Sequence, residues 1–250
     1  MVHLKTKKEI EILREAGFLL FSVMKEIKEM IKPGVATDYL DSTAESLILK
    51  MGAKPNFKGY RNFPATICTC INEEIVHCAP SKEKKIKEGD ILSIDGGLLF
   101  KGFNADMAFT VPVGEVSFEA KRLIRVTKKA LKRGIKKARP GNTFGDIGNT
   151  IQRYVESQGF NVVRELCGHG IGRALHEEPD VLNYGKRGEG IKLKEGMVFC
   201  LEPMVTAGDW HIKRAEDGYG YKTKDNSLSA HFEAMIAITK DGCEVLTPLL

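Results

Sequence analysis

Residues 90–111 read DILSIDGGLLFKGFNADMAFTV and contain two apolar runs separated by Lys101-Gly102. This pattern predicts two strands joined by a tight turn, in which glycine supplies the positive φ that such turns need. Folding the segment about residues 100–102 brings Asp95 and Asp106 together on neighbouring strands, where facing side chains lie roughly 5 Å apart. Two carboxylates at that distance repel each other by about 4 kcal/mol at an effective dielectric of roughly 20, so we expect a divalent cation to compensate them.

The composition is that of an ordinary soluble globular protein. Of the 250 residues, 42% are hydrophobic and 28% are charged, so a sizeable core is available. The longest apolar run near the N-terminus, residues 17–24, is too short to cross a bilayer, and we expect neither secretion nor membrane insertion. The six cysteines show no repeated CxxC spacing, which argues against a structural zinc site and for reduced thiols in the cytoplasm.

A repeat relates the two parts of the chain. The sequences KPG at 32–34 and RPG at 139–141 lie 107 positions apart. The same offset places EGDILSID, residues 88–95, on EGMVFCLE, residues 195–202, so that Asp95 corresponds to Glu202. In the same way VHCAP, at 76–80, resembles LHEEP, at 175–179, with an offset of 99.

Helical patterns occur at matching places in this repeat. Thr6 and Glu9 form a capping box before an apolar helical pattern that ends at Pro33-Gly34. Thr37 or Asp38 is expected to cap a second helix that ends at Gly52, and residues 117–139 predict the counterpart of the first helix. We therefore expect one α+β domain over residues 1–250, whose two similar halves, approximately 1–113 and 114–250, share one core across a pseudo-two-fold axis.

The second half carries an acidic strand pair of its own. After Glu202 the chain passes through an excursion rich in glycine and lysine at residues 208–224, and it returns as one apolar strand at residues 227–239. Glu233 lies in this strand. We expect it to partner Glu202 as the two aspartates of the first hairpin partner each other.

One histidine and the four acids form a candidate metal site. His169 lies in CGHGIG, residues 167–172, where small neighbours leave its imidazole accessible. Alone, an acid near a strand end usually belongs to a turn, and a histidine in a glycine-rich loop usually hydrogen bonds there. Together, four negative charges match two divalent cations, and oxygen-rich ligation with one imidazole suits Mn, Fe, Co or Zn in a two-metal hydrolase. The expected ligands are Asp95, Asp106, His169, Glu202 and Glu233.

Two further histidines, His77 and His176, occupy related positions in the two halves. They could be core histidines. Their pairing by the repeat suggests instead that they flank the metal site, one donating to a substrate carbonyl oxygen and the other engaging the neighbouring amide nitrogen. The sequence His176-Glu-Glu is not a zincin motif, because no second histidine follows at the required spacing.

Further motifs extend across the whole chain. They are GY at 59–60 with FP at 63–64, INE at 71–73, ID at 94–95, CGHGIG at 167–172, HEEP at 176–179 and LEPM at 201–204. With the acids above, these motifs resemble the methionine aminopeptidases of type I. The resemblance implies the pita-bread fold, a pseudo-symmetric α+β arrangement with a central antiparallel sheet covered by helices. The length leaves no room for the helical insertion of type II.

The resemblance implies a two-metal peptidase that removes the initiator methionine from nascent proteins whose second residue is small. Asp95 would chelate one metal ion, while Asp106 and Glu233 would bridge both ions. His169 and Glu202 would complete the ligands of the second ion, and Glu202 would also accept the proton of the nucleophilic water.

A methionine pocket and a monovalent cation site also follow from the resemblance. Substrate-binding residues would be His77, His176, Tyr60, Phe63, Cys68, Leu175 and Tyr219. Apolar and soft side chains suit a thioether. The sequence departs from the family pattern where Leu175 replaces an aromatic residue, Tyr219 replaces a common tryptophan, and Cys78 and Asn62 replace glycine. Asn72 and Ser229 match positions that bind a monovalent cation through backbone oxygens.

Two alternatives compete with this interpretation. Prolidase and aminopeptidase P use a similar ligand set, but they carry an additional N-terminal domain that this chain lacks. A non-catalytic relative that binds nucleic acid or protein would use the basic stripe of residues 128–139, which is more often a solvated face. The net charge of +5 fits at most weak, salt-sensitive association with a ribosome surface, and we expect a monomer without membrane or specific nucleic-acid binding.

Overall fold

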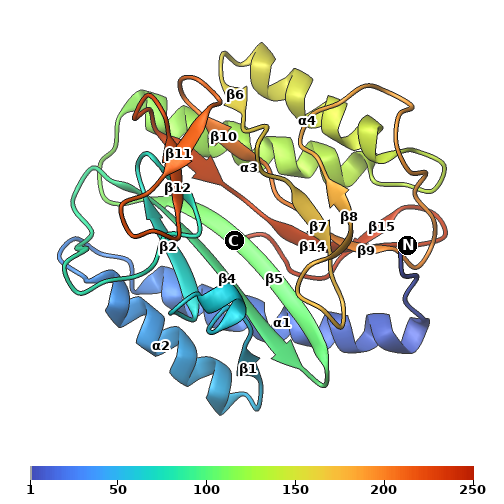
Figure 1. Ribbon diagram of the computed structural model, residues 1–250, viewed down its shortest axis with the longest axis horizontal. Coiled ribbons are helices and arrows are strands. Elements are labelled where there is room, and N and C mark those ends of the chain that lie inside the picture. The colour runs from blue at the N-terminus through green and yellow to red at the C-terminus, as the bar shows by residue number, and fades with distance from the viewer. Residues whose placement is uncertain (1) are drawn as a thin grey trace.

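The computed structural model describes residues 2–250, and within them two pairs of α-helices lie outside the strands (Figure 1). The helices are α1 (Lys7–Glu29), α2 (Thr37–Lys50), α3 (Phe118–Lys137) and α4 (Phe144–Ser157), with the short 3-10 helix η1 (Tyr60–Asn62). The strands of residues 1–113 are β1 (Lys54–Pro55), β2 (Ile67–Ile71), β3 (Glu74–Val76), β4 (Ile91–Phe100) and β5 (Phe103–Pro112). The later strands are β6 (Asn161–Val162), β7 (Gly168–Gly170), β8 (Glu177–Val181), β9 (Val198–Leu201), β10 (Met204–Thr206), β11 (Ile212–Arg214), β12 (Tyr221–Thr223), β13 (Ser229–His231), β14 (Ala234–Ile238) and β15 (Cys243–Val245).

The predicted start of α1 is confirmed, whereas the predicted end of α1 and the predicted cap of α2 differ from the structure. The capping box before α1 is confirmed, because the Glu9 amide donates to the Thr6 hydroxyl and the Thr6 amide donates to the Glu9 carboxylate. Helix α1 ends at Glu29, before the expected stop at Pro33-Gly34. The predicted cap of α2 is wrong: Ala36 is the N-cap residue, and the Thr37 hydroxyl instead accepts from the backbone N–H of Ser81 at 2.9 Å.

The hairpin that contains the two aspartates forms as predicted. Strands β4 and β5 pair antiparallel without interruption from Ile91 opposite Pro112 to Phe100 opposite Phe103. Lys101 and Gly102 form the turn with φ of 48° and 80°. Strands β1 and β2 also pair with β4, so β4 is the central strand of a four-stranded sheet.

The second acidic strand pair is more irregular than expected. The predicted single strand at residues 227–239 is broken into β13 and β14, and the facing strand is likewise broken into β9 and β10. Strand β14 joins the five-stranded sheet β15-β14-β9-β7-β8, whereas β13 joins the three-stranded sheet β13-β10-β6. The excursion before β13 contains β11 and β12, which form a fourth sheet with β3 of the other half.

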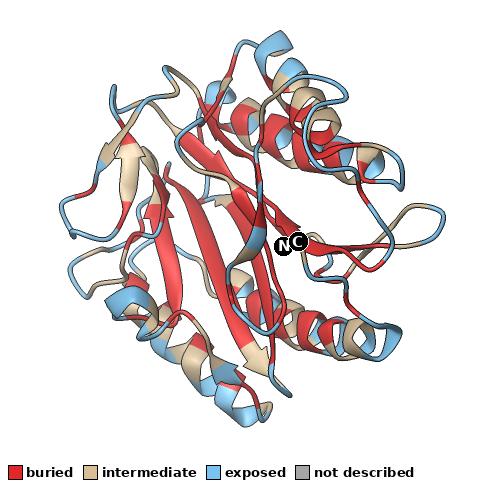
Figure 2. Cartoon of the chain, turned by 45° about the vertical axis from the view of Figure 1, so that its right-hand side comes forward, coloured by how far each residue is buried: buried red, intermediate tan, exposed pale blue. Residues whose placement is uncertain are grey.

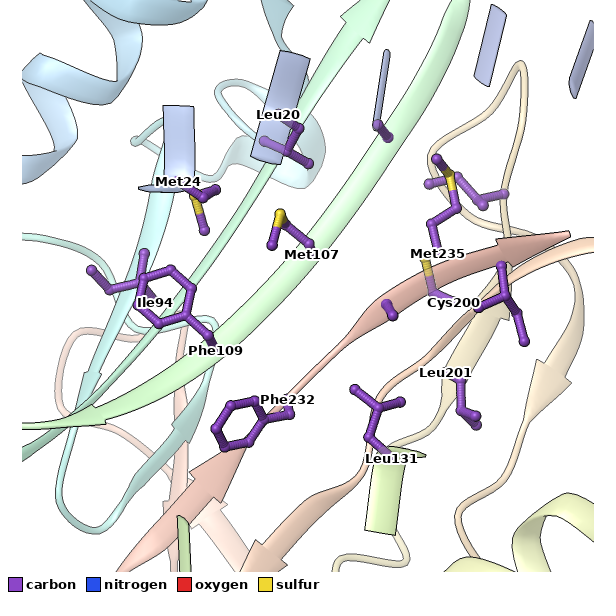
Figure 3. Packing of buried hydrophobic residues seen from close by; sticks show 14 of the residues in the cluster. Leu20, Met24, Ile94, Met107, Phe109, Leu131, Cys200, Leu201, Phe232 and Met235 are labelled. Atoms are coloured by element: carbon purple, nitrogen blue, oxygen red, sulfur yellow. The ribbon is translucent and has the colours of Figure 1, made fainter. Parts of the chain in front are cut away.

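One apolar core runs between the helix pairs, and most residues of the long strands and of the inner helix faces are buried (Figure 2). Met24 of α1 packs toward Ile94 and Phe109 of the first hairpin, while Phe232 and Leu131 continue the same cluster beyond it (Figure 3). Burial of such side chains contributes roughly 1.5–3 kcal/mol each.

Two elements tie the ends of this core together. Gly17 of α1 lies so close to the C-terminal segment that a β-carbon there would stand 2.2 Å from the carbonyl oxygen of Leu246.

None of the helices within residues 2–250 has the length and apolar character needed to cross a membrane.

Candidate metal centre and substrate pocket

The four predicted acids converge at the floor of one cavity. Each of these four residues is at most 8% exposed. Asp95 and Asp106 come from β4 and β5, whereas Glu202 and Glu233 lie at the two strand breaks of the second half. A hydrogen bond of 2.9 Å from the Glu233 amide to the Ala108 carbonyl fastens that break to the first hairpin. The structure therefore brings together the acids that the repeat related.

His169 lies on β7 between these acids. Its Nε2 atom is 3.8 Å from Asp106 Oδ2 and 3.7 Å from Glu202 Oε1. Its Nδ1 atom lies 2.9 Å from the Gly170 carbonyl oxygen, an acceptor that places the proton on Nδ1 and leaves the Nε2 lone pair free for a metal. The flanking glycines are required by packing, since a β-carbon at Gly168 would stand 2.4 Å from the Cys200 carbonyl oxygen.

The electrostatics of these residues fit divalent cations. Burial raises the pKa of Asp95 to about 6, and burial together with repulsion from Glu233 raises the pKa of Asp106 well above its usual range. Burial and repulsion from Asp95 raise the pKa of Glu202, and burial with repulsion from Glu202 and Asp95 raises the pKa of Glu233. Oxygens of Asp95, Asp106 and Glu233 are buried without a hydrogen-bond partner among the described residues. A buried group in this condition costs about 1–3 kcal/mol, which cation ligation would offset.

Two overlapping groups of donors can hold such ions. Atoms of Asp106, His169, Cys200 and Glu233 all lie within 4.8 Å of one another, and atoms of Glu202, His231 and Glu233 satisfy the same limit. Glu233 belongs to both groups, as an acid that bridges two ions would. The donor set of carboxylates with imidazole is the one expected for Mn, Fe, Co or Zn.

His77 and His176 flank this cluster. The His176 ring lies 4.2 Å from the His169 ring between centroids, and its Nδ1 atom lies 2.8 Å from the Tyr60 hydroxyl oxygen. His77 has a left-handed backbone with φ of 62°, a strained conformation that clusters at functional sites. Burial and the neighbouring histidines lower the pKa of His77 to about 4 and that of His176 to about 3. Both rings are therefore neutral near pH 7.

The predicted metal ligands and substrate-binding residues all line a single cavity of about 550 Å³, whereas Asn72 and Ser229 lie outside its lining. Its wall contains Tyr60, Phe63, Cys68, Leu175 and Tyr219. The rings of Phe63 and Tyr219 meet edge to face at 5.8 Å, which joins the first half to the excursion of the second. The cavity therefore combines apolar side chains with the acidic cluster, an arrangement that suits a small apolar side chain held beside a metal centre.

The sequence reasoning missed several residues of this site. Arg214 and Tyr221 line the cavity from β11 and β12, two strands that the sequence analysis did not predict. His231 lies beside Glu202, and its position two residues before Glu233 in a predicted strand was an available signal. Cys200 lies within the acid cluster, but burial and neighbouring carboxylates raise the pKa of its thiol, which disfavours the thiolate that binds metals.

Comparisons with known proteins bear on the same site. Residues 11–240 match the model of metallopeptidase family M24. The chain is 47% identical over 247 residues to the methionine aminopeptidase of Clostridium acetobutylicum, with 99% of each protein covered. It is 45% identical to methionine aminopeptidase 1 of Bacillus subtilis, again with 99% of each covered.

Solved structures give the same relationship. The methionine aminopeptidase of Rickettsia prowazekii superposes with a TM-score of 0.97 at 41% identity, covering 99% of this chain and all of that one. The prolidase of Pyrococcus horikoshii superposes with a TM-score of 0.78 at 24% identity, and the match covers 99% of this chain but 64% of that longer one. The expected pita-bread fold is confirmed, and the prolidase alternative is not favoured.

Proposed function

Because this chain belongs to metallopeptidase family M24, we propose that it is a methionine aminopeptidase of type I, which removes the N-terminal methionine from nascent proteins whose second residue is small. The observation that supports this function most strongly is the convergence of four buried acids and His169 beneath an apolar pocket. Methionine aminopeptidases at 45–47% identity over the full length support the same substrate.

The chain's own residues divide the work of peptide hydrolysis. Asp95, Asp106, His169, Glu202 and Glu233 would hold two divalent cations, which supply Lewis-acid activation of a water molecule and of the scissile carbonyl when bound. Glu202 accepts the proton of that water. His77 and His176, neutral near pH 7, hold the peptide by donating to its carbonyl oxygen and by engaging its amide nitrogen.

The pocket residues set the preference for methionine. Tyr60, Phe63, Cys68, Leu175 and Tyr219 enclose the side chain, and their apolar and polarizable surface suits a thioether. Leu175 is 6% exposed and offers less area than an aromatic ring, so the pocket is wider at this point than in the family pattern.

Several finer properties complete the proposal. Residues 1–250 act as one metallopeptidase domain of two related halves, approximately 1–113 and 114–250. A monovalent cation binds beside Asn72 and Ser229, which meet through a backbone hydrogen bond of 2.8 Å. The six free cysteines support a cytoplasmic location. The exposed basic residues of α3 support weak ribosome association of a monomer, which raised salt would abolish.

Hydrolysis of short peptides tests the function directly. Metal-depleted protein is reconstituted in turn with Co²⁺, Mn²⁺, Fe²⁺ and Zn²⁺, and methionine release is measured from Met-Ala-Ser, from a matched peptide with leucine in the second position, and from X-Pro dipeptides. We expect metal-dependent cleavage of Met-Ala-Ser and poor cleavage of the others. Cleavage confined to the proline peptides would overturn the assignment.

A further inference from the structure

His231 is a buried histidine that the proposed mechanism does not use. It is the last residue of β13, is 1% exposed, and places its Nε2 atom 3.5 Å from Glu202 Oε2. Neither of its ring nitrogens has a hydrogen-bond partner within residues 2–250. Two unpaired ring nitrogens in a buried position cost about 1–3 kcal/mol each, so this side chain requires a compensating partner.

Hydrogen bonds fix the backbone of His231, although its ring nitrogens have no partner in the described part of the chain. The Thr110 hydroxyl accepts from the His231 amide at 2.9 Å and donates to the His231 carbonyl oxygen at 2.8 Å. Ser93 contacts the same hydroxyl at 2.8 Å from the neighbouring strand. The first hairpin therefore fixes the point from which the imidazole extends toward the acids, as a preorganised ligand requires.

The ring stands among donors with the spacing of a metal site. His231, Glu202 and Glu233 each offer one atom, and these atoms lie within 4.8 Å of one another. Donor atoms that share an ion at about 2.0–2.2 Å fall in this range of mutual distances. Glu202 lies between two imidazoles, with Oε1 at 3.7 Å from His169 and Oε2 at 3.5 Å from His231.

We propose that His231 is a metal ligand, which gives the centre a second imidazole in addition to His169. The inference rests on the proposed two-metal function and adds a ligand to the five in that proposal. With a histidine in each donor group, the centre favours Fe, Co or Zn over Mn, because imidazole suits the softer ions better than an all-carboxylate site does.

A hydrogen bond from His231 to Glu202 is the competing role. The separation of 3.5 Å is longer than the usual 2.7–3.2 Å of an N–H···O bond, so the geometry does not favour this role. Ligation instead uses the nitrogen that already faces the acids. The two roles differ in one measurable respect, which is whether the imidazole bonds to the metal.

Proton NMR of the Co²⁺-loaded protein in water decides between them. A ligating imidazole gives an exchangeable N–H resonance with a large paramagnetic shift, so we expect two such resonances, from His169 and His231. The variant His231→Gln should keep one, His169→Gln should keep the other, and His211→Gln should keep both, since His211 is exposed on the excursion and stacks on Trp210. A single resonance that survives His231→Gln would overturn the inference and leave the five-ligand centre standing.

The same experiment separates failure of the inference from failure of the function. Absence of any shifted resonance in Co²⁺-loaded wild type would contradict the metal centre itself. Calorimetric titration supplies a second readout: His231→Gln should weaken binding of one of the two Co²⁺ ions by more than about 100-fold, beyond the effect of a residue that only supports a ligand. Unchanged affinity for both ions would also refute ligation, and His231→Asn repeats the test should the glutamine variant fold poorly.

Discussion

The two strand pairs that supply the acids hold them in different ways. Strands β4 and β5 are unbroken, and Asp95 faces Ala108 while Asp106 faces Gly97, so the two aspartates stand diagonally across the ladder. In the other pair Leu201 faces Ala234 and Met204 faces His231, which sets Glu202 directly opposite Glu233 at the break. The first pair carries its two acids on an uninterrupted ladder, whereas the second carries them at a break in its strands.

The connections differ as much as the strands. The first pair is closed by the two residues Lys101 and Gly102, while the second is joined through residues 207–228. That longer connection folds into β11 and β12 and pairs Tyr221 with Val76 of the first half. It also brings Tyr219 to the cavity wall. The first pair is therefore a rigid scaffold, and the second carries the substrate wall as well as its acids.

The largest effect is expected from replacing an acid that would contact both metal ions, one in each strand pair. Asp106→Asn and Glu233→Gln should each lose both metal ions and lower kcat/KM by about 10³-fold or more, because metal activation is worth several kcal/mol. Metal analysis and the Met-Ala-Ser assay measure this. The exposed Asp209→Asn is the control. If only one of the two variants retained two ions, the two strand pairs would not contribute equally to metal binding.

The next effect concerns the metal-free protein. Burial raises the pKa of Asp95 to about 6, so the folded protein binds a proton that the unfolded chain releases above about pH 4, and stability falls as the pH rises between these values. With EDTA near pH 7.5, Asp95→Asn should be more stable than wild type by on the order of 2 kcal/mol, and equal to it near pH 4.

The two pairs should differ in the size of this gain. Glu202→Gln should stabilise the metal-free protein more than Asp95→Asn does, because Glu202 faces Glu233 directly. Thermal unfolding in EDTA at the two pH values measures both variants, and excess Mn²⁺ should reverse the order in favour of wild type. A wild type that is more stable in EDTA at either pH would contradict the prediction.

A smaller effect is expected from the wall that the longer connection supplies. Tyr219→Ala removes the edge-to-face contact with Phe63 and one side of the pocket. We expect kcat/KM for Met-Ala-Ser to fall about 10-fold, or about 1.4 kcal/mol, with unchanged metal content. Tyr39→Ala, which alters an exposed ring on α2, is the matched control. Loss of metal from Tyr219→Ala would show that the wall also supports the centre.

The smallest effect belongs to the short turn. Gly102 has a φ of 80°, so Gly102→Ala should cost about 1 kcal/mol and lower Tm by about 2–4 °C without changing activity. Gly242→Ala is the control, because Gly242 has space around it and an ordinary φ. Equal Tm for the two variants would show that the turn does not limit the stability of the scaffold.

Much of this arrangement could be predicted from local pattern. The hairpin at 90–111 follows from its alternation and its turn, and the convergence of the acids follows from the repeat offset that maps Asp95 onto Glu202. These features are encoded within short windows or by direct correspondence between windows. The capping box of Thr6 and Glu9 is equally local and was equally predictable.

What escaped prediction depends on contacts between distant segments. The segment at 227–239 contains no glycine or proline, so nothing in its pattern marks the break between β13 and β14. Thr37 leaves its capping role because Ser81 offers its hydroxyl a tertiary partner. Strands β11 and β12 form because β3 provides an edge, and their short polar sequences carry no strand signal of their own.

The clamp between Thr110 and His231 links positions 121 apart in the sequence. Closing so long a loop costs conformational entropy that the contacts made at its ends must offset. Until the loop closes, the chain holds two separate pairs of like charges, neither of which forms a metal centre by itself. The metal centre is therefore complete only when β13 packs against the first hairpin.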